Sequence, residues 1–330
     1  MNHLEHETLA ERTLFVIRFA SSSQTIGALS KKTGADEAQI RTALEFLHDW
    51  GYKIRRTPHG EVAFISAPDL LSSTEISHHI RARRMGAVVK SYRTVKSTND
   101  LASQFADDGA TEGTIITAEE QTRGRGRLGR SWHSPAGMGI YVSIVLRPSF
   151  KPEEAPGVSL MTALALADAI AELGVHDVKI KWPNDILISG KKVAGILTEL
   201  SADRGKINHL IVGVGINVNH KSEDFPDDIR SIATSLRRVL KHKVSRVELL
   251  ARFLALFEKE YTLYSKDRLK KSHKRLVAYS SVIGQPVTVQ SGKNVIAGIA
   301  RDIDASGALV LQTADGAVTI NAGEVTVVKR

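Results

Sequence analysis

The stretch Arg-Gly-Arg-Gly-Arg-Leu-Gly-Arg at residues 123–130 decides how the chain is interpreted. Its glycines let the backbone fold closely around a ligand, and its four arginines offer bidentate donors for carboxylate and phosphate oxygens. The spacing Gly124-x-Gly126-x-x-Gly129 also fits the dinucleotide-binding fingerprint, but that motif opens a helix, whereas turn-forming residues follow here at 131–137. We interpret 123–130 as a flexible cationic loop that orders over an anionic ligand. A solvated basic loop or an RNA-binding Arg-Gly stretch is the alternative.

Short β-prone runs and longer helical runs alternate on both sides of this loop, over residues 90–278. Several predicted strands follow one another without a helix between them, which favours a mixed α+β sheet over a strict βαβ repeat. Strands are expected at 114–118, 140–146, 178–182, 192–200 and 209–218, and helices at 99–107, 157–173 and 244–264.

Residues 1–66 have the pattern of a winged helix-turn-helix domain. A first helix is expected over 8–20, a second is capped by Thr25 and ended by Gly34, and a third is capped by Asp36. Apolar residues recur at helical spacing in the second and third helices. Two strands, 52–55 and 61–65, are expected to form a hairpin wing around the turn Thr-Pro-His-Gly.

The remaining segments complete a chain of three predicted domains. Residues 67–89 are expected to be a linker that carries a helix over roughly 73–84 and leads into a strand. Residues 279–330 change to short apolar runs separated by Ser-Gly and Asp-Gly turn pairs, which is typical of a small all-β barrel. Its strands are expected at 286–289, 295–301, 309–312 and 318–321. The predicted domains are therefore 1–66, 90–278 and 279–330.

The composition excludes several classes of protein. The chain has no cysteine, which rules out disulfides and thiolate chemistry, and its 12 histidines show no metal-ligand spacing. No apolar run approaches the roughly 18–20 residues of a membrane-spanning helix, and the polar, acidic start lacks signal-peptide features. We therefore expect a cytoplasmic protein without a membrane partner. The net charge of +9 lies outside the N-terminal domain, because residues 1–75 hold eight Lys/Arg against ten Asp/Glu.

Further motifs accompany residues 123–130, the arginine loop. In chain order they are Ser97-Thr98-Asn99, Gln121, Trp132, Lys-Trp-Pro-Asn-Asp at 181–185, Lys-Val-Ala-Gly-Ile-Leu-Thr-Glu at 192–199 and Gly-Val-Gly-Ile-Asn-Val-Asn at 213–219. In this order and at these spacings they resemble the biotin–protein ligases, over almost the whole chain. The N-terminal domain makes the chain similar to the bifunctional members, which combine a ligase with a biotin-operon repressor. The resemblance implies a class II synthetase-like ligase domain in the centre and an SH3-like barrel at the C-terminus.

The resemblance also implies roles for individual residues. Neutral polar side chains would surround the uncharged ureido ring of biotin, arginines would close over its carboxylate and the α-phosphate, and Lys192 would be the active-site lysine. Trp132 would pack on adenine, with a core aromatic residue as the alternative. The implied biotin site is Ser97, Thr98, Asn99, Gln121, Arg125, Gly126, Arg127, Lys192 and Gly195, and the implied ATP site is Arg127, Arg130, Trp132, Lys181, Asp185, Lys192 and Asn217.

The implied reaction needs no protein nucleophile. Biotin's carboxylate attacks the α-phosphate of ATP to give biotinyl-5′-AMP, which then acylates a lysine of the biotin carboxyl-carrier protein of a biotin-dependent carboxylase. Lys192, Arg125, Arg127 and Mg²⁺ would supply positive charge where the anions meet; the metal ligands stay unknown. Two alternatives are a non-enzymatic, ligand-sensing repressor and a lipoate-type ligase. The phosphate-directed cations favour an enzyme, and the motifs at 123–130 and 181–185 favour biotin.

Repression is a separate question. The start of the third helix would face DNA bases, and it carries Asp36 and Glu37, which repel phosphate. Operator binding through a homodimer and a retained domain that only orders the ligase both remain open. The basic residues available to contact DNA are Lys31, Lys32, Arg41, Lys53, Arg55 and Arg56.

Overall fold

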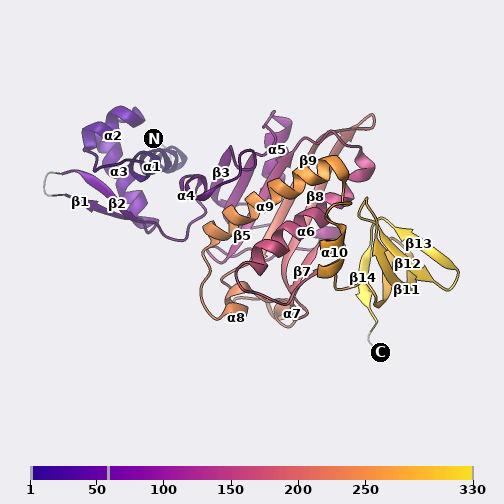
Figure 1. Cartoon of the computed structure of the whole chain (residues 1–330). Coiled ribbons are helices and arrows are strands. Elements are labelled where there is room, and N and C mark those ends of the chain that lie inside the picture. The colour runs from indigo at the N-terminus through magenta and orange to yellow at the C-terminus, as the bar shows by residue number, and fades with distance from the viewer. Residues whose placement is uncertain (1–2, 58–59, 329–330) are drawn as a thin grey trace. The chain divides into compact units, whose positions relative to one another are not determined.

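The computed structural model of the chain describes residues 3–57 and 60–328 (Figure 1). Backbone packing divides the chain into two compact units, Met1–His79 and Ile80–Arg330. The domain boundaries that the sequence analysis drew at 66, 89 and 278 stay predictions.

The N-terminal unit contains the three helices and the hairpin that the sequence predicts. They are α1 (His3–Arg18), α2 (Ile26–Thr33), α3 (Glu37–Asp49) and the antiparallel strands β1 (Lys53–Arg56) and β2 (Val62–Ser66). Helix α1 begins and ends earlier than the expected range 8–20. Of the expected hairpin turn, Pro58 and His59 lie outside the described residues.

Local side-chain chemistry sets the ends of these helices. Thr25 Oγ1 accepts a hydrogen bond from Ala28 N at 3.1 Å, and Gly34 ends α2 in the left-handed conformation at φ +72°. Asp36 and Gln39 form a reciprocal capping box at the start of α3. The three predicted caps are therefore confirmed. The apolar faces of the helices meet the hairpin in one core, which includes Leu14, Leu29, Ile40, Leu47 and Val62.

A short helix, α4 (Ser73–His79), packs against α1 in the same unit. The hydroxyls of Ser73 and Thr74 donate to Glu11 Oε2 at 2.9 and 3.1 Å. Arg18 Nε donates to the buried carboxylate of Glu75 at 3.3 Å. The helix predicted over 73–84 is thus present but ends at His79.

The larger unit is built on a seven-stranded mixed sheet (Figure 1). Strands β3 and β4 are parallel, and every other neighbouring pair is antiparallel. This confirms the predicted mixed α+β sheet, although β7 was not predicted. In spatial order the strands are β3 (Val89–Val95), β4 (Ile115–Gln121), β5 (Gly139–Leu146), β9 (Lys206–Asn217), β8 (Lys191–Asp203), β7 (Asp185–Ile188) and β6 (Val178–Lys181).

Helices cover this sheet. Helix α5 (Thr98–Asp107) packs on β4, β5 and β9, whereas α6 (Pro156–Ala171) packs on β6, β7 and β8 and against α9 (Arg246–Asp267). The segment Pro152–Ala171 is long and apolar enough, by length and composition, to cross a membrane, which corrects the expectation that no such run exists; 78% of its most apolar stretch is buried inside the fold. The shorter helices are η1 (Arg127–Gly129), η2 (Pro152–Glu154), α7 (Asp227–Arg230), α8 (Leu236–Leu240) and α10 (His273–Tyr279).

The C-terminal segment forms a five-stranded antiparallel sheet in the order β13-β12-β11-β10-β14. The four predicted strands are present and the last strand, β14, was not predicted. Their bounds are β10 (Pro286–Ser291), β11 (Asn294–Ile303), β12 (Leu309–Thr313), β13 (Gly316–Ile320) and β14 (Glu324–Val327). Buried Trp182 donates from Nε1 to Gly307 O at 2.9 Å, so the turn before β12 is tied to the loop that joins β6 and β7.

A buried ion pair holds the start of α9 against the sheet. Arg246 Nη1 donates to Glu119 Oε2 at 2.9 Å and to Gly139 O at 3.1 Å, and both side chains of the pair are less than a tenth exposed. Removing one partner leaves an uncompensated charge in a dry environment, which is strongly destabilising.

We predict that Arg246→Met lowers the free energy of unfolding by about 3–5 kcal/mol. Adding Glu119→Leu to that variant should restore part of the loss, because no unpaired carboxylate then remains. Chemical denaturation of both variants and the wild type measures this. Equal stability of Arg246→Met and wild type would contradict the assignment.

Candidate active site

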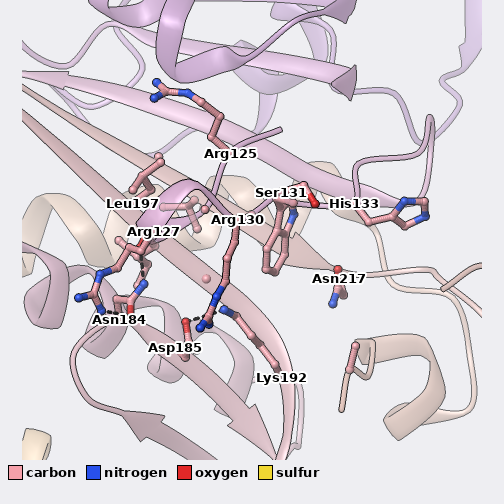
Figure 2. A pocket seen from close by; sticks show the side chains of 18 of the residues that line it. Arg125, Arg127, Arg130, Ser131, His133, Asn184, Asp185, Lys192, Leu197 and Asn217 are labelled. Carbon is pink, nitrogen blue, oxygen red and sulfur yellow. Dashed lines mark hydrogen bonds and ion pairs between the residues drawn. The ribbon is translucent and has the colours of Figure 1, made fainter. Parts of the chain in front are cut away.

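A pocket of about 470 Å³ is lined by the start of α5, the arginine loop and the strands β8 and β9 (Figure 2). The structure brings together every residue that the sequence analysis assigned to biotin or ATP, and the role of each stays a prediction. These residues are Ser97, Thr98, Asn99, Gln121, Arg125, Gly126, Arg127, Arg130, Trp132, Lys181, Asp185, Lys192, Gly195 and Asn217.

One end of the pocket is polar and uncharged. Ser97 caps α5, and Thr98 donates from N and Oγ1 to Gln121 Oε1 at 2.9 and 3.1 Å. Ser143 Oγ lies 2.6 Å from Asn99 Oδ1 and 2.8 Å from Thr98 Oγ1. Ser97 therefore both caps α5 and lines the pocket. A buried network of this kind fixes the orientation of its donors and acceptors.

Glycines on β8 and β9 keep the floor of the pocket flat. Gly195 is paired with Gly215, and alternate residues of a strand point to the same face, so Gly213 and Gly215 face the same side of the sheet. A Cβ atom at Gly213 would lie 2.1 Å from Asn99 Oδ1, and one at Gly215 would lie 2.5 Å from the indole Nε1 of Trp132. These glycines are needed because Asn99 and Trp132 lie directly on the sheet.

The arginine loop is held on its C-terminal side by two arginines. Arg127 donates to Asn184 Oδ1 at 3.0 Å and to Gly323 O at 3.1 Å, and Arg130 pairs with Glu324 at 2.8 Å. Burial lowers the pKa of the Arg127 guanidinium, and the carboxylates of Asp185 and Glu324 oppose that shift. The loop thus bridges the central sheet and the turn before β14.

Arg125 has a different environment. Its guanidinium lies 2.6 Å from Asp100 Oδ1 and 2.8 Å from Glu199 Oε1. Figure 2 shows it pointing away from Lys192 and from the other two labelled arginines. Arg125 lines the pocket, and its predicted contact with the biotin carboxylate or α-phosphate stays a prediction.

Lys192 lines the pocket from the start of β8. Its Nζ lies 2.7 Å from Asp185 Oδ1 and 5.4 Å from the centre of the Trp132 ring. The Lys192 backbone is bridged to a neighbouring loop, because its N donates to Ile232 O and its O accepts from Thr234 N. These backbone bonds fix the point from which the side chain extends, and the pairing with Asp185 orients the ammonium group.

Comparison with known proteins assigns the chain to a family. The "Biotin/lipoate A/B protein ligase family" matches residues 91–217, and the "Biotin protein ligase C terminal domain" matches residues 282–328. The "Bifunctional ligase/repressor BirA" of Bacillus subtilis (strain 168) is 34% identical over 297 residues, which are 90% of this chain and 91% of that protein. This chain belongs to the biotin protein ligase family.

Two further members of the biotin protein ligase family support the same conclusion. The "Biotin--[acetyl-CoA-carboxylase] ligase" of Mycobacterium tuberculosis is 35% identical over 238 residues, which are 69% of this chain and 85% of that protein. The structure of the Aquifex aeolicus biotin protein ligase in complex with biotin and ATP aligns with a TM-score of 0.64 and 29% identity, over 74% of this chain and 100% of that one. The predicted family is confirmed.

The sequence analysis missed the apolar end of the pocket. Phe225, Ile229, Ile232 and Ala233 line it from α7 and its flanks. Their spacing is that of one helix face, so periodicity over 225–233 was the available signal, but the helix itself is only Asp227–Arg230. Asn184, which accepts from Arg127, was also missed, although it lies within the motif at 181–185.

A buried histidine packs against the apolar end of the pocket through Phe225. His220 is fully buried, its ring stacks on Phe225 with centroids 5.0 Å apart, and His133 lies 6.3 Å away. Within residues 3–57 and 60–328, neither ring nitrogen of His220 has a hydrogen-bond partner. Burial lowers the pKa of His220 to about 4, with His133 and Arg246 acting in the same direction and Asp224 opposing them.

We predict that His220 makes the fold sensitive to acid. Its pKa is lower in the folded chain than the ordinary 6.5, so the neutral ring stabilises the fold above pH 6.5 and this contribution is lost as the pH falls towards 4. His220→Leu removes the titration. The difference in free energy of unfolding between variant and wild type should change by at most about 1.4 kcal/mol per pH unit over that window. Parallel pH profiles of the two proteins would contradict the prediction.

Proposed function

We propose that this family member activates biotin with ATP and attaches it to a lysine of a biotin carboxyl-carrier protein. The observation that carries the proposal is the order of environments along one pocket: neutral Asn99 lies over Gly213, Trp132 and Lys192 lie over the neighbouring Gly215 and Gly195, and the apolar residues Ile232 and Ala233 adjoin Lys192. Biotinyl-5′-AMP has the same order, with a ureido ring, a carboxyl–phosphate anhydride and an adenine. The names of the relatives support the same reading.

The proposed placement of substrates follows the chemistry of each part. The ureido ring hydrogen-bonds the polar end, where Asn99 and Gln121 hold fixed amides. Adenine packs against Trp132 and the apolar residues around α7, because flat aromatic surfaces stack on one another. The reacting carboxylate and α-phosphate then lie between Arg127 and Lys192.

Two anions must approach in the first step, so positive charge has to be in place beforehand. Lys192 is proposed to sit beside the α-phosphate and exchange part of its pairing with Asp185 for that charge. Arg127, already oriented by Asn184 and Gly323, is proposed to contact the carboxylate. In the second step the neutral ε-amine of the carrier lysine attacks the anhydride carbonyl, and AMP leaves.

Mg²⁺ is proposed to accompany the ATP phosphates and to neutralise charge on the departing pyrophosphate. Within the described residues no group of three or more His, Asp or Glu side chains is placed to hold a metal ion. Nucleotide-bound Mg²⁺ keeps waters and phosphate oxygens as most of its ligands, so the donor set here fits a metal that arrives with ATP.

We predict that Lys192→Ala slows adenylate formation about 10²-fold or more while the fold survives. Its side chain is 35% exposed, so stability should change little. Pyrophosphate release in the presence of biotin and ATP measures the step, and intact mass of the carrier domain measures the whole reaction. Lys191→Ala, one residue earlier on β8, is the matched control and should behave as wild type. A near-normal rate for Lys192→Ala would transfer the role to Lys181 or the arginines.

The flanking domains are part of the proposal. Residues 1–66 are proposed to be a winged helix-turn-helix, since α2 and α3 meet at the Gly34 turn and a hairpin follows them. The central domain is proposed to be class II synthetase-like, and the C-terminal five-stranded sheet, residues 279–330, to be an SH3-like barrel. ATP and carrier proteins are found in the cytoplasm, so we propose that the enzyme acts there.

A second proposed function is repression of biotin genes, which the name "Bifunctional ligase/repressor BirA" of relatives supports. One helix-turn-helix reads only a half-site, so a repressor must dimerise. The side chains proposed to contact DNA phosphates are all exposed: Lys31, Lys32, Arg41, Lys53, Arg55 and Arg56.

We predict that affinity for the upstream region of the protein's own biotin genes rises with biotinyl-5′-AMP and falls steeply with salt, because the basic residues displace counterions. A gel shift with and without the adenylate, at two salt concentrations, measures both effects. The absence of a shift in either state, in a preparation with full ligase activity, would leave residues 1–66 as a domain without a repressor function.

A further inference from the structure

Arg125 is fastened to two carboxylates that lie outside the arginine loop. Its Nη1 lies 2.8 Å from Glu199 Oε1, and its Nη2 lies 2.8 Å from Glu199 Oε2 and 2.6 Å from Asp100 Oδ1. Asp100 is on α5 and Glu199 is on β8, so one planar guanidinium joins three parts of the chain. A rigid fork of donors favours this bidentate geometry.

Glu199 has a second partner, which belongs to the polar end of the pocket. Its Oε2 accepts a hydrogen bond from Asn99 Nδ2 at 2.6 Å, and Asn99 is only 5% exposed. The same oxygen accepts from Arg125. One carboxylate therefore contacts both the Asn99 amide and the arginine loop.

The hydrogen bonds continue from Asn99 to both bases of the loop. Asn99 Oδ1 and Thr98 Oγ1 both contact Ser143 Oγ, and Thr98 donates to Gln121. Gln121 Nε2 then donates to Ser134 Oγ at 3.0 Å. Gln121 precedes the loop and Ser134 follows it, so a connected network runs from inside the loop, across the polar end, to both loop bases.

We propose that Asp100 and Glu199 are positioning residues that hold the arginine loop closed over the pocket through Arg125, and that Glu199 couples loop closure to occupation of the polar end. The proposal rests on the proposed function, in which that end receives the biotin head group. Gly124 and Gly126 give the loop a large conformational entropy to lose on ordering. The contacts of Arg125 with Asp100 and Glu199 order the loop in advance, so ligand binding has to offset a smaller loss of conformational entropy.

An arrangement in which Arg125 leaves its carboxylates to contact the ligand predicts the opposite change in biotin affinity. If Arg125 had to leave its carboxylates to contact the ligand, Asp100 and Glu199 would compete with biotin, and neutralising them would strengthen binding. If they position the loop, neutralising them weakens binding. Glu199→Gln separates the two cases cleanly, because a glutamine oxygen still accepts from Asn99 while the charge that holds Arg125 is removed.

The experiment uses the full chain with Glu199→Gln, Asp100→Asn and wild type. We expect the Kd for biotin, measured by calorimetry, to rise about three- to tenfold in each variant, with a comparable increase in the dissociation rate of biotinyl-5′-AMP. The KM for ATP at saturating biotin should stay within about twofold of wild type, because the loop is then closed by the ligand. Trypsin should cut the ligand-free loop at 123–130 faster in both variants.

Glu172→Gln is the matched control. It removes an ion pair of similar exposure, with Arg252, between the end of α6 and α9, and Glu172 does not line the pocket. It should leave all four measurements unchanged.

Biotin affinity equal to or above that of wild type in Glu199→Gln, or an unchanged trypsin pattern in both variants, overturns the proposal. Asp100 is 49% exposed, so Asp100→Asn tests whether the carboxylates hold Arg125 and the loop even if Glu199→Gln folds poorly. The trypsin measurement needs no ligand. If the protein forms no biotinyl-5′-AMP but the variants are cleaved faster, the result would support the positioning role of Asp100 and Glu199 and refute the proposed function.

Discussion

The pairing of β8 with β9 is the constraint on which the rest of the pocket depends. Its register sets Gly195 opposite Gly215 and Gly213 opposite Leu197, so the three glycines form a strip without side chains that faces α5 and the arginine loop, and Leu197 lines the pocket beside it. Asn99 and Trp132 lie directly on this strip. A shift of one residue would replace the glycines with Val214 and Ile216 and fill the pocket, because alternate residues of a strand point to opposite faces. The shape of the pocket therefore depends on the register between β8 and β9.

On this floor, the cationic side chains have fixed partners before any ligand binds. Lys192 faces Asp185, Arg130 faces Glu324, and Arg127 uses the neutral oxygens of Asn184 and Gly323. Fixed partners remove the need to reorganise side chains when phosphate charge develops, which is the main source of electrostatic catalysis. Arg127 has no carboxylate within hydrogen-bonding distance among the described residues, so a ligand carboxylate meets a cation whose charge is not already paired.

The sequence predicted those parts of the structure that depend on neighbouring residues. Thr25 and Asp36 cap backbone N–H groups three residues further along the chain, and Gly34 ends α2 through its own backbone conformation. The long strands follow from apolar runs. The four-residue strands β7 and β14 and the short helix α7 were missed, because so few residues carry no clear period. The site residues were found through their motifs, yet the partners of Arg125 and Arg127 were not, because Glu199, Asn184 and Gly323 come together only through sheet pairing and the packing of the C-terminal sheet.

The acidic start of α3 looks different once its side chains are placed. Asp36 is occupied in the capping box with Gln39, so its charge stabilises the helix N-terminus instead of standing free at the surface. Glu37 lies 3.6 Å from Arg41, one turn along the same helix, and each neutralises the other in part. The first turns of α3, with their N-cap, therefore carry one net negative charge, from Asp36 and Glu37 against Arg41. In the proposed repressor function, most of the electrostatic attraction to DNA phosphates therefore comes from the end of α2 and from the hairpin, where Lys53, Arg55 and Arg56 are exposed and no acidic residue lies within β1 or β2. In that proposal the hairpin makes most of the contacts with the DNA backbone, and Arg41 adds one from α3.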